Sequence, residues 1–310
     1  MNFRHADYET AALPLSYAAT VRESMQTTAG IAPAPVHLDA AVFILQHTCY
    51  FPLTTCVLHF YNEPRRMRAI AVIPARLASA RLPRKVLREI AGRPMLAWVY
   101  EAARSSPLVA DVIVATDSDE VMDACRQNGW NVRMTSPAHR SGTDRVYEVA
   151  CAVAADVYVN VQGDEPLARP EHIGALLAPM KDASVLVSTI KTPAAAAAVD
   201  NPNAVKVVTD SAGRALYFSR ATIPYDRDRS GQPRYFKHLG FYAYRKPALE
   251  RFCSLPESAL ERSERLEQLR FLENGIPIYV AETPFDTIGV DAEEDLRRVE
   301  DILKHRTVAR

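Results

Sequence analysis

Four basic side chains without an acidic neighbour follow an apolar run near residue 71. The segment "AVIPARLASARLPRKVL", residues 71–87, carries Arg76, Arg81, Arg84 and Lys85 and no Asp or Glu. A guanidinium can pair with two phosphate oxygens at once, and an ammonium supplies a compact charge. The preceding run is typical of a buried strand, so we favour a site for a small phosphate-bearing anion over simple solvation of these side chains. Neither GxxxxGK[ST] nor GxGxxG occurs, which excludes a standard P-loop or dinucleotide fingerprint.

A second candidate site lies at the end of another apolar run, in "VNVQGDEP", residues 159–166. Gly163 lets the backbone approach a ligand closely. Asp164 offers hard oxygens that suit Mg²⁺ bridging nucleotide phosphates, although an ordinary turn acid is the alternative. Asp291, in "TIGVDAEEDL" (287–296), is adequately explained by the pattern alone as a helix N-cap.

The elements that would position these residues alternate between strand and helix. Such alternation predicts βαβ units and a mainly parallel sheet. Right-handed crossovers then place the loops after the strands along one edge, where the basic segment and Asp164 would meet. Expected strands span 68–75, 111–117, 131–136 and 156–162, and expected helices span 94–106, 118–129 and 142–154.

The pattern changes after residue 200. Two strand-like runs in "AVKVVTDSAGRALYFSR" (204–220) flank residues 210–213, which predicts a hairpin. Further strands are expected over 238–245 and 276–283. Helices are expected over 247–255, over 263–275 with Ser263 as N-cap and Gly275 as stop, and over 291–306, whereas the alanine run 194–198 is expected to be a loop or short helix.

Composition limits the classes of function. The chain has 310 residues, 48% of them hydrophobic, and its 37 basic and 37 acidic residues give a formal net charge of zero. These values suit a soluble globular protein and exclude a general polyanion binder, so we expect no nucleic-acid partner. The odd number of cysteines, without CxxC spacing, predicts free thiols in a reducing cytoplasm rather than disulfides or a zinc site: Cys49, Cys56, Cys125, Cys151 and Cys253.

Residues 1–66 differ from the rest of the chain and lack a signal-peptide pattern. We expect a poorly ordered N-terminal extension, followed by one domain over 67–310. Segment 40–62 has no charged residue and is about as long as a membrane span, but Gln46, His47 and Pro52 interrupt its centre. We therefore favour a tail or peripheral segment over membrane contact; attachment to a membrane surface through this extension is the alternative.

Eight segments occur in an order typical of one family. They are "IPARLASARLPRKVL", "HRSGTDR", "VNVQGDEP", "NPNAVKVV", "YFSRATIPYDRDR", "HLGFYAYR", "LEQLRFLENG" and "GVDAEEDL". Together they resemble the 3-deoxy-manno-octulosonate (Kdo) cytidylyltransferases, or CMP-Kdo synthetases, over residues 67–306. The resemblance implies a nucleotide-diphospho-sugar transferase fold, α/β with helices flanking the sheet and a smaller β-rich part for the sugar site and dimerisation. It also implies a cytoplasmic homodimer that makes CMP-Kdo and pyrophosphate from CTP and Kdo with Mg²⁺, for lipopolysaccharide synthesis.

The resemblance assigns roles to particular residues. Those matching the nucleotide site are Ala75, Arg76, Ser79, Arg81, Lys85, His139, Ser141, Gly142, Thr143 and Arg145. Those matching the sugar site are Gln162, Arg220, His238, Tyr242, Glu267 and Gln268. Asp164 and Asp291 match the metal carboxylates, and with Arg81 and Lys85 they would neutralise charge as the anomeric hydroxyl attacks the α-phosphorus. No Ser or Cys nucleophile and no general base is assigned.

Arg84 departs from the family pattern, which usually has Gly before the phosphate-loop lysine. If that Gly serves a positive φ angle, Arg84 would strain the loop, or it could add a charge contact. Two other functions remain open: cytidylyl transfer to another acidic sugar or a phosphonate, and nucleotide binding by a regulator without turnover. The presence of both aspartates, Arg81 and Lys85 speaks against the regulator.

Overall fold

The computed structural model describes residues 67–77, 79, 81–231 and 233–308. The expectations for the N-terminal extension, including segment 40–62, lie outside these residues. Within the described ranges, no helix is long and apolar enough to cross a membrane.

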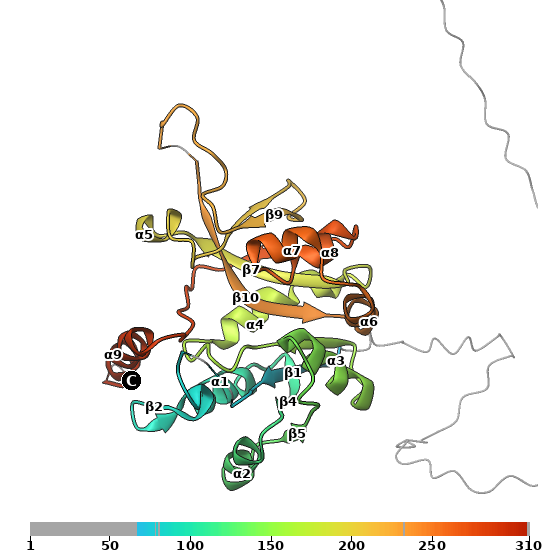
Figure 1. Cartoon of the computed structure of the whole chain (residues 1–310), viewed down its shortest axis with the longest axis vertical. Helices are drawn as coiled ribbons and strands as arrows, with labels where there is room; N and C mark the ends of the chain where they lie inside the picture. Colours follow the sequence, from blue (N-terminus) through green and yellow to red (C-terminus); the bar gives the residue numbers. More distant parts are fainter. Residues whose placement is uncertain (1–66, 78, 80, 232, 309–310) are drawn as a thin grey trace, which may run out of the picture. The chain divides into compact units, whose positions relative to one another are not determined.

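A mainly parallel sheet with helices on both faces forms the body of the protein, as the sequence predicts (Figure 1). The strand order is β11-β7-β10-β6-β1-β4-β5, and β10 runs antiparallel to both of its neighbours in this path. The hairpin of β8 and β9 joins through β10 and confirms the expected turn over 210–213. The strands are β1 (Ala69–Pro74), β4 (Val109–Thr116), β5 (Val132–Met134), β6 (Val157–Asn160), β7 (Val187–Pro193), β8 (Lys206–Thr209), β9 (Ala215–Ser219), β10 (Phe236–Tyr244) and β11 (Tyr279–Glu282), with β2 (Glu89–Ile90) and β3 (Arg93–Pro94) forming a separate pair.

Both faces of the sheet are covered, which explains the continuous apolar run of β1. Ala71 and Ile73 pack with α1, α2 and α4, whereas Ile70 and Val72 pack with α3, α6 and α8. Alternating side chains of one strand therefore enter two different cores. The helices are α1 (Met95–Arg104), α2 (Asp119–Gln127), α3 (Gly142–Ala152), α4 (Pro170–Leu177), α5 (Ala196–Val199), α6 (Lys246–Ser254), α7 (Ala259–Glu264), α8 (Leu269–Glu273) and α9 (Glu293–Val308), with short 3-10 turns η1 (Lys85–Leu87) and η2 (Pro179–Lys181).

The expected single helix over 263–275 is wrong. Two short helices occupy this region, because Arg265 adopts a left-handed conformation with φ 54° and interrupts the helical path after α7. The N-cap is Ser258, which forms a reciprocal capping box with Glu261, and not Ser263, whose hydroxyl donates to a backbone carbonyl of α7. The break lies directly before Glu267 and Gln268, two predicted sugar-site residues.

Besides the short β2–β3 pair and the 3-10 turns, two longer elements had no counterpart in the sequence-based expectations, α4 and β7. The pattern of β7 is obscure because Ser188, Thr189 and Lys191 are polar although the strand is buried. Their side chains are satisfied by distant partners: the Ser188 hydroxyl donates to the Leu176 carbonyl at 2.6 Å, and Lys191 Nζ donates to Thr209 Oγ1 at 2.9 Å. Such partners are invisible in a local hydrophobic pattern.

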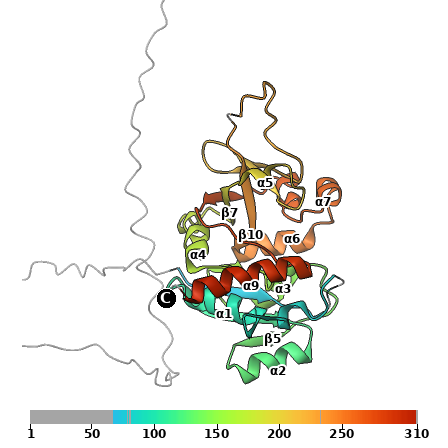
Figure 2. The same cartoon turned by 90° about the vertical axis from the view of Figure 1, so that its left-hand side faces the viewer.

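The closing helix α9 packs along the layer that holds α1 (Figure 2). Its residues Leu296, Val299 and Leu303 form an apolar cluster with Met95 of α1 and with Val290, which lies just before the helix. The cluster brings the last part of the chain next to the loop that follows β1, because Leu82 of that loop belongs to the same cluster.

Candidate functional site

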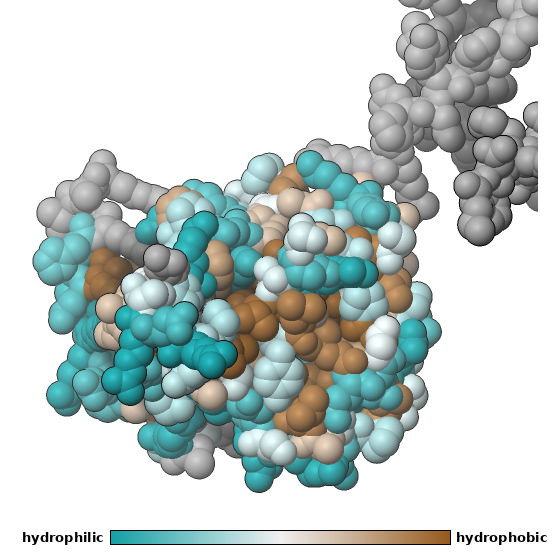
Figure 3. Space-filling view, turned by 90° about the horizontal axis from the view of Figure 1, so that it is seen from above, coloured by the Kyte–Doolittle hydropathy of each residue, from teal (hydrophilic) through white to brown (hydrophobic). Residues whose placement is uncertain are grey.

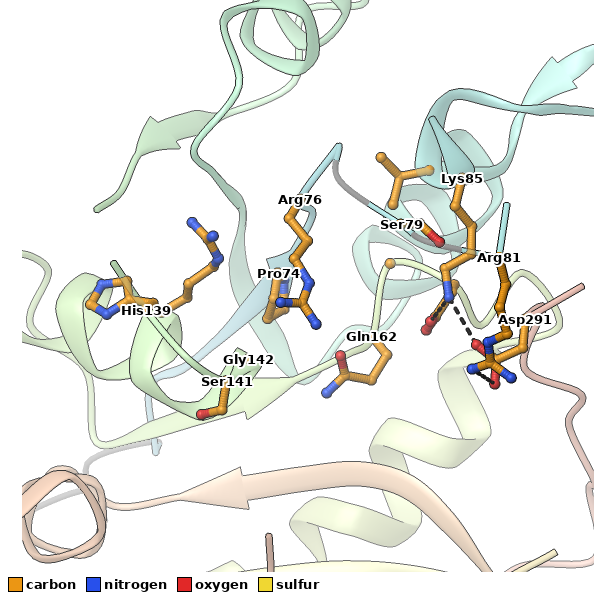
Figure 4. Close-up of a pocket in the computed structure, with 14 residues that line it drawn as sticks. Pro74, Arg76, Ser79, Arg81, Lys85, His139, Ser141, Gly142, Gln162 and Asp291 are labelled. Atoms are coloured by element: carbon orange, nitrogen blue, oxygen red, sulfur yellow. Dashed lines mark hydrogen bonds and ion pairs between the residues drawn. The ribbon is translucent and has the colours of Figure 1, made fainter. Parts of the chain in front are cut away.

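A cavity of about 770 Å³ lies beside the carboxyl ends of β1 and β6. Three predicted groups meet there: the loop after β1, the start of α3, and the two candidate metal carboxylates. Figure 4 shows Lys85 and Arg81 beside Asp291, while Arg76 and Gln162 lie across the same space. The lining consists of Pro74, Arg76, Ser79, Arg81, Lys85, Val86, His139, Ser141, Gly142, Arg145, Gln162, Gly163, Asp164 and Asp291.

Lys85 lies between the two carboxylates. Its Nζ is 2.6 Å from Asp164 Oδ2 and 3.1 Å from Asp291 Oδ1, and Arg81 pairs with the other oxygen of Asp291 at 3.1 Å. Burial by itself would lower the pKa of Lys85, but the two carboxylates outweigh burial and hold this pKa above its usual value. The geometry therefore brings together two acids that are far apart in the sequence and keeps the ammonium charged.

The start of η1 explains how the loop tolerates Arg84. Arg84 has a φ angle of 57°, the left-handed conformation that glycine adopts most easily. A non-glycine residue costs about 1 kcal/mol in this region. The Arg84 guanidinium pairs with Glu120 in the first turn of α2 and does not line the cavity. Both expectations for Arg84 are thus met, but its charge contact is directed to the protein and not to the ligand space.

Gly163 allows the loop after β6 to approach β1. A Cβ atom placed on Gly163 would lie 2.9 Å from the Pro74 carbonyl oxygen and 3.7 Å from Ala75 Cβ. The first distance is shorter than real Cβ contacts, and the atom in the way belongs to the backbone. Only glycine therefore lets Asp164 lie this close to the loop after β1. Ala75, predicted to belong to the nucleotide site, is itself fully buried and does not line the cavity.

The first turn of α3 is fixed by a capping box, in which the Ser141 side chain accepts from the Asp144 backbone N–H and Asp144 accepts from the Ser141 backbone N–H. Arg145 also lines the cavity but is only 3% exposed. It donates to Thr135 Oγ1 at 2.6 Å and pairs with Asp117 after β4. Arg145 therefore mainly holds the loops around the cavity in place.

His139 and Thr143 complete the segment predicted to hold the nucleotide. The His139 ring, which precedes α3, pairs with Glu148 within that helix. Thr143 is buried and does not line the cavity; its hydroxyl instead donates to Glu267 Oε2 at 3.2 Å. This bond links the start of α3 to the region predicted to bind the sugar.

The predicted sugar-site residues divide into two groups. Gln162 lines the cavity, whereas His238, Tyr242 and Gln268 are mostly buried and lie outside its lining. Burial lowers the pKa of His238 to about 3, with a smaller effect from neighbouring Lys237, so its imidazole is neutral at pH 7.

Glu267, Gln268 and Arg220 also lie outside the cavity lining. Desolvation by the surrounding protein raises the pKa of Glu267, although the hydrogen bond from Thr143 opposes this shift. Gln268 Nε2 has no hydrogen-bond partner among the described residues, a feature that favours a ligand or water there. The Arg220 guanidinium donates to backbone carbonyls, including that of Glu264 at 2.7 Å.

Two apolar residues of the cavity, Pro74 and Val86, were not among the predicted site residues. Apolar residues of this kind do not indicate a binding site by themselves. Their positions could have indicated it, because Pro74 ends the strand before the basic loop and Val86 follows Lys85. Glu165, next to Asp164, was also not assigned a role; burial raises the pKa of its carboxyl to about 7, and the Asp164 charge adds to this shift.

The donor set suits a magnesium–nucleotide complex better than a metal site made of protein alone. No group of three or more His, Cys, Asp or Glu side chains capable of holding a metal occurs in the described ranges. Mg²⁺ commonly uses one or two carboxylates and takes its other ligands from phosphates and water. Asp164 and Asp291 provide two such carboxylates, and the ammonium of Lys85 between them marks a position that favours positive charge.

Comparisons with known proteins identify the family of this chain. The family model described as Cytidylyltransferase matches residues 70–282. A 3-deoxy-manno-octulosonate cytidylyltransferase from Koribacter versatilis (strain Ellin345) is 71% identical over 244 residues, covering 79% of this chain and 93% of the relative. Another from Acidobacterium capsulatum is 60% identical over 240 residues, covering 77% of this chain and 98% of the relative.

A solved structure of CMP:2-keto-3-deoxy-manno-octonic acid synthetase complexed with CTP is 44% identical and has a TM-score of 0.74, covering 77% of this chain and 99% of its own. The mainly parallel α/β fold and the resemblance inferred from the sequence are therefore both confirmed. The chain belongs to the 3-deoxy-manno-octulosonate cytidylyltransferase family.

Proposed function

We propose that this enzyme transfers CMP from CTP to the anomeric hydroxyl of Kdo, giving CMP-Kdo and pyrophosphate for lipopolysaccharide synthesis. The observation that carries the proposal is the cluster in which Lys85 contacts Asp164 and Asp291 within the cavity that also holds the basic loop. Relatives up to 71% identical bear the name of this activity.

The reaction is an in-line displacement at the α-phosphorus. The Kdo hydroxyl oxygen forms the new bond, and the bond to pyrophosphate breaks. Arg76, Arg81 and Lys85 line the cavity, and their charges would neutralise negative charge that gathers on the phosphate oxygens. Mg²⁺, held by Asp164 and Asp291 with the nucleotide phosphates, would add Lewis-acid stabilisation of the same charge. No covalent intermediate with the protein is required.

We infer that the sugar binds beside Gln162 and the start of α3. The hydrogen bond from Thr143 to Glu267 runs from the cavity edge toward Gln268, whose amide has an unused donor. Gln162 and Gln268 offer hydrogen bonds that match sugar hydroxyls, and Arg220 offers a charge that matches the Kdo carboxylate. Release of Arg220 from its backbone acceptors would be needed for that contact.

The direct test is Mg²⁺-dependent pyrophosphate release by the full chain. We expect turnover with CTP and Kdo and much less with ATP, GTP or UTP. A panel of other acidic sugars and phosphonates as acceptors tests the alternative substrates. CTP binding without pyrophosphate release for any acceptor would instead support the non-catalytic regulator.

Removal of either candidate metal carboxylate tests the assignment of the cluster. Asp164→Ala and Asp291→Ala should each reduce turnover by about 100-fold or more, because charge stabilisation at the phosphates is lost. Circular dichroism should show an unchanged fold, since both side chains are partly exposed, at 31% and 52%. Near-normal turnover in both variants would contradict the metal assignment.

We also propose a homodimer. Figure 3 shows apolar side chains gathered on the face seen from above in the orientation of Figure 1. Two large apolar side chains lie exposed on the β-rich part: Leu216 on β9 is 62% exposed and Tyr225 in the following loop is 80% exposed. Analytical ultracentrifugation should give a dimer, and Leu216→Asp with Tyr225→Asp should shift it to monomer. A wild-type monomer at micromolar concentration would contradict the proposal.

We propose a cytoplasmic location, where CTP is available. The alternative is that the N-terminal extension attaches the enzyme to a membrane surface. Fractionation of the full chain against a chain that starts at Met67 tests this. Loss of membrane association only in the shorter chain would support an anchor, and equal fractionation would exclude it.

A further inference from the structure

Asp291 lies at the end of an irregular segment, residues 283–292, that connects β11 to α9. In Figure 1 this segment descends from the upper part of the view to α9. It contains no helix or strand, so a regular hydrogen-bond ladder does not fix its path. A carboxylate on an unsupported segment would spread over many positions, at an entropic cost when it must bind. Other contacts must therefore hold Asp291 opposite Asp164.

Glu165 contacts this segment from the loop after β6. Its Oε2 accepts a hydrogen bond from Thr287 Oγ1 at 2.7 Å. A Cβ atom on Gly289 would lie 3.2 Å from Glu165 Oε1, so the glycine backbone packs closely against the same carboxylate. The Val290 N–H donates to the Asp164 carbonyl at 2.9 Å. Three successive contacts thus join the segment to the loop that carries one candidate metal ligand, just before the other.

Lys237 makes a second set of contacts with the segment. Its Nζ donates to Asp286 Oδ1 at 2.9 Å and to the Thr287 carbonyl at 2.7 Å. Thr287 is only 2% exposed, and Val290 is fully buried in the cluster beneath α9. Lys237 belongs to β10 and precedes His238, a candidate sugar-site residue. Thr287 is therefore fixed between the strand of the sugar side and the loop of the metal side.

We propose that Glu165 is a positioning residue which, through Thr287, holds Asp291 against Asp164 so that the two carboxylates can share one divalent cation. This inference rests on the proposed function for the identity of the ligand. It adds a role for a residue that does not line the cavity. Glu165 does not line the cavity, and its carboxylate contacts Thr287 instead. Glu165 acts on Asp291 indirectly, because its contact with Thr287 fixes the backbone of the segment that carries Asp291.

The test compares two disrupting variants with two controls in the full chain. Thr287→Val removes the hydroxyl but keeps the shape and the backbone contacts with Lys237. Glu165→Ala removes the acceptor. Glu165→Gln keeps an oxygen that can accept from Thr287. Ser184→Ala breaks a hydroxyl–carboxylate bond of the same 2.7 Å length outside the cavity.

Two quantities are measured: the Kd for Mn²⁺ without nucleotide, by electron paramagnetic resonance of free Mn²⁺, and the half-saturating Mg²⁺ concentration for pyrophosphate release. We expect Thr287→Val and Glu165→Ala to raise both by about tenfold or more, the usual effect of losing a group that orients a metal ligand. Turnover of these variants should recover at high Mg²⁺, which a merely unfolded site would not do. Glu165→Gln and Ser184→Ala should stay within about threefold of the wild type.

A folded Thr287→Val protein with wild-type Mn²⁺ affinity would overturn the inference. If Glu165→Ala fails to fold, the Thr287→Val result decides alone. The Mn²⁺ comparison does not depend on the acceptor sugar. Absence of wild-type turnover with CTP and Kdo would therefore count against the proposed function, while a tenfold loss of Mn²⁺ affinity in Thr287→Val would still support the positioning role.

Discussion

Replacement of Lys85 by methionine should strengthen metal binding and weaken catalysis at the same time. In the nucleotide-free protein, a cation that binds Asp164 and Asp291 has to displace an ammonium located 2.6 Å and 3.1 Å from their oxygens. Two unit charges at 4 Å attract by about 4 kcal/mol at the effective dielectric constant of a protein surface, whereas fully exposed pairs contribute about 0–1 kcal/mol.

The observed burial places the Lys85 contact between these limits. Its side chain is 14% exposed, while those of Asp164 and Asp291 are 31% and 52% exposed. We therefore take about 2 kcal/mol as the free energy of displacing the ammonium, which corresponds to about 30-fold in affinity. Lys85→Met should bind Mn²⁺ about 30-fold more tightly without nucleotide, because methionine fills the space without competing for the carboxylates.

The same variant should lose about 100-fold or more in kcat with CTP and Kdo, since a charge that stabilises the transition state is absent. Mn²⁺ binding is measured by isothermal titration calorimetry, and turnover by pyrophosphate release. Lys304→Met is the matched control, because Lys304 is 58% exposed and pairs only with Glu300 among the described residues. If folded Lys85→Met binds Mn²⁺ no more tightly than the wild type, the assignment of Lys85 as the occupant of the cation position is wrong.

Three further predictions concern stability and backbone geometry. Gly163→Ala should lower the free energy of unfolding by about 1–3 kcal/mol and reduce turnover, because its Cβ would meet the Pro74 carbonyl at 2.9 Å. Gly174→Ala, within α4 and with nothing within 4 Å of the new Cβ, should raise the free energy of unfolding by up to about 1 kcal/mol, because alanine favours a helix more than glycine does. Equal unfolding curves for both variants would contradict the packing argument. Arg84→Gly should be about 1 kcal/mol more stable to urea than Arg84→Ala, because both lose the ion pair but only glycine relieves the left-handed conformation; an equal midpoint would exclude strain. The pKa of His238 is lowered to about 3 in the folded protein, so the unfolded chain binds more protons between about pH 6.5 and 3 and stability falls by about 1.4 kcal/mol per pH unit as pH drops through this window. His238→Gln should remove this contribution in urea titrations at pH 7 and pH 5, and an unchanged slope with pH would show that His238 is not buried in its neutral form.

Much of the candidate nucleotide site was predictable because its signals are local. Arg76, Arg81 and Lys85 are close in sequence and follow one strand, and the edge rule for parallel sheets correctly brings them to Asp164. Asp291 is different. From the sequence alone Asp291 is predicted only as a helix N-cap, whereas α9 begins two residues later at Glu293. The family resemblance was needed to connect Asp291 with Asp164.

The region assigned to the candidate sugar site was less predictable because its residues are positioned by long-range contacts. The break at Arg265 directs the chain into two short helices where a single periodic helix was expected. Buried Ser188 and Thr189 make β7 look unlike a core strand, although their hydroxyls are paired with backbone carbonyls across the fold. Local periodicity cannot register a polar group whose partner lies elsewhere in the chain.

The amino-acid sequence by itself determined the alternating α/β architecture and the chemistry of the phosphate end, since apolar periodicity, cap residues and charge clusters act over a few residues. Only the tertiary structure decided that Lys85 lies between Asp164 and Asp291, that Arg84 points to Glu120, and that the segment before Asp291 is held from two sides. These contacts join residues from different strands and loops. Their geometry depends on packing of the whole sheet and its helices, which no short stretch of sequence contains.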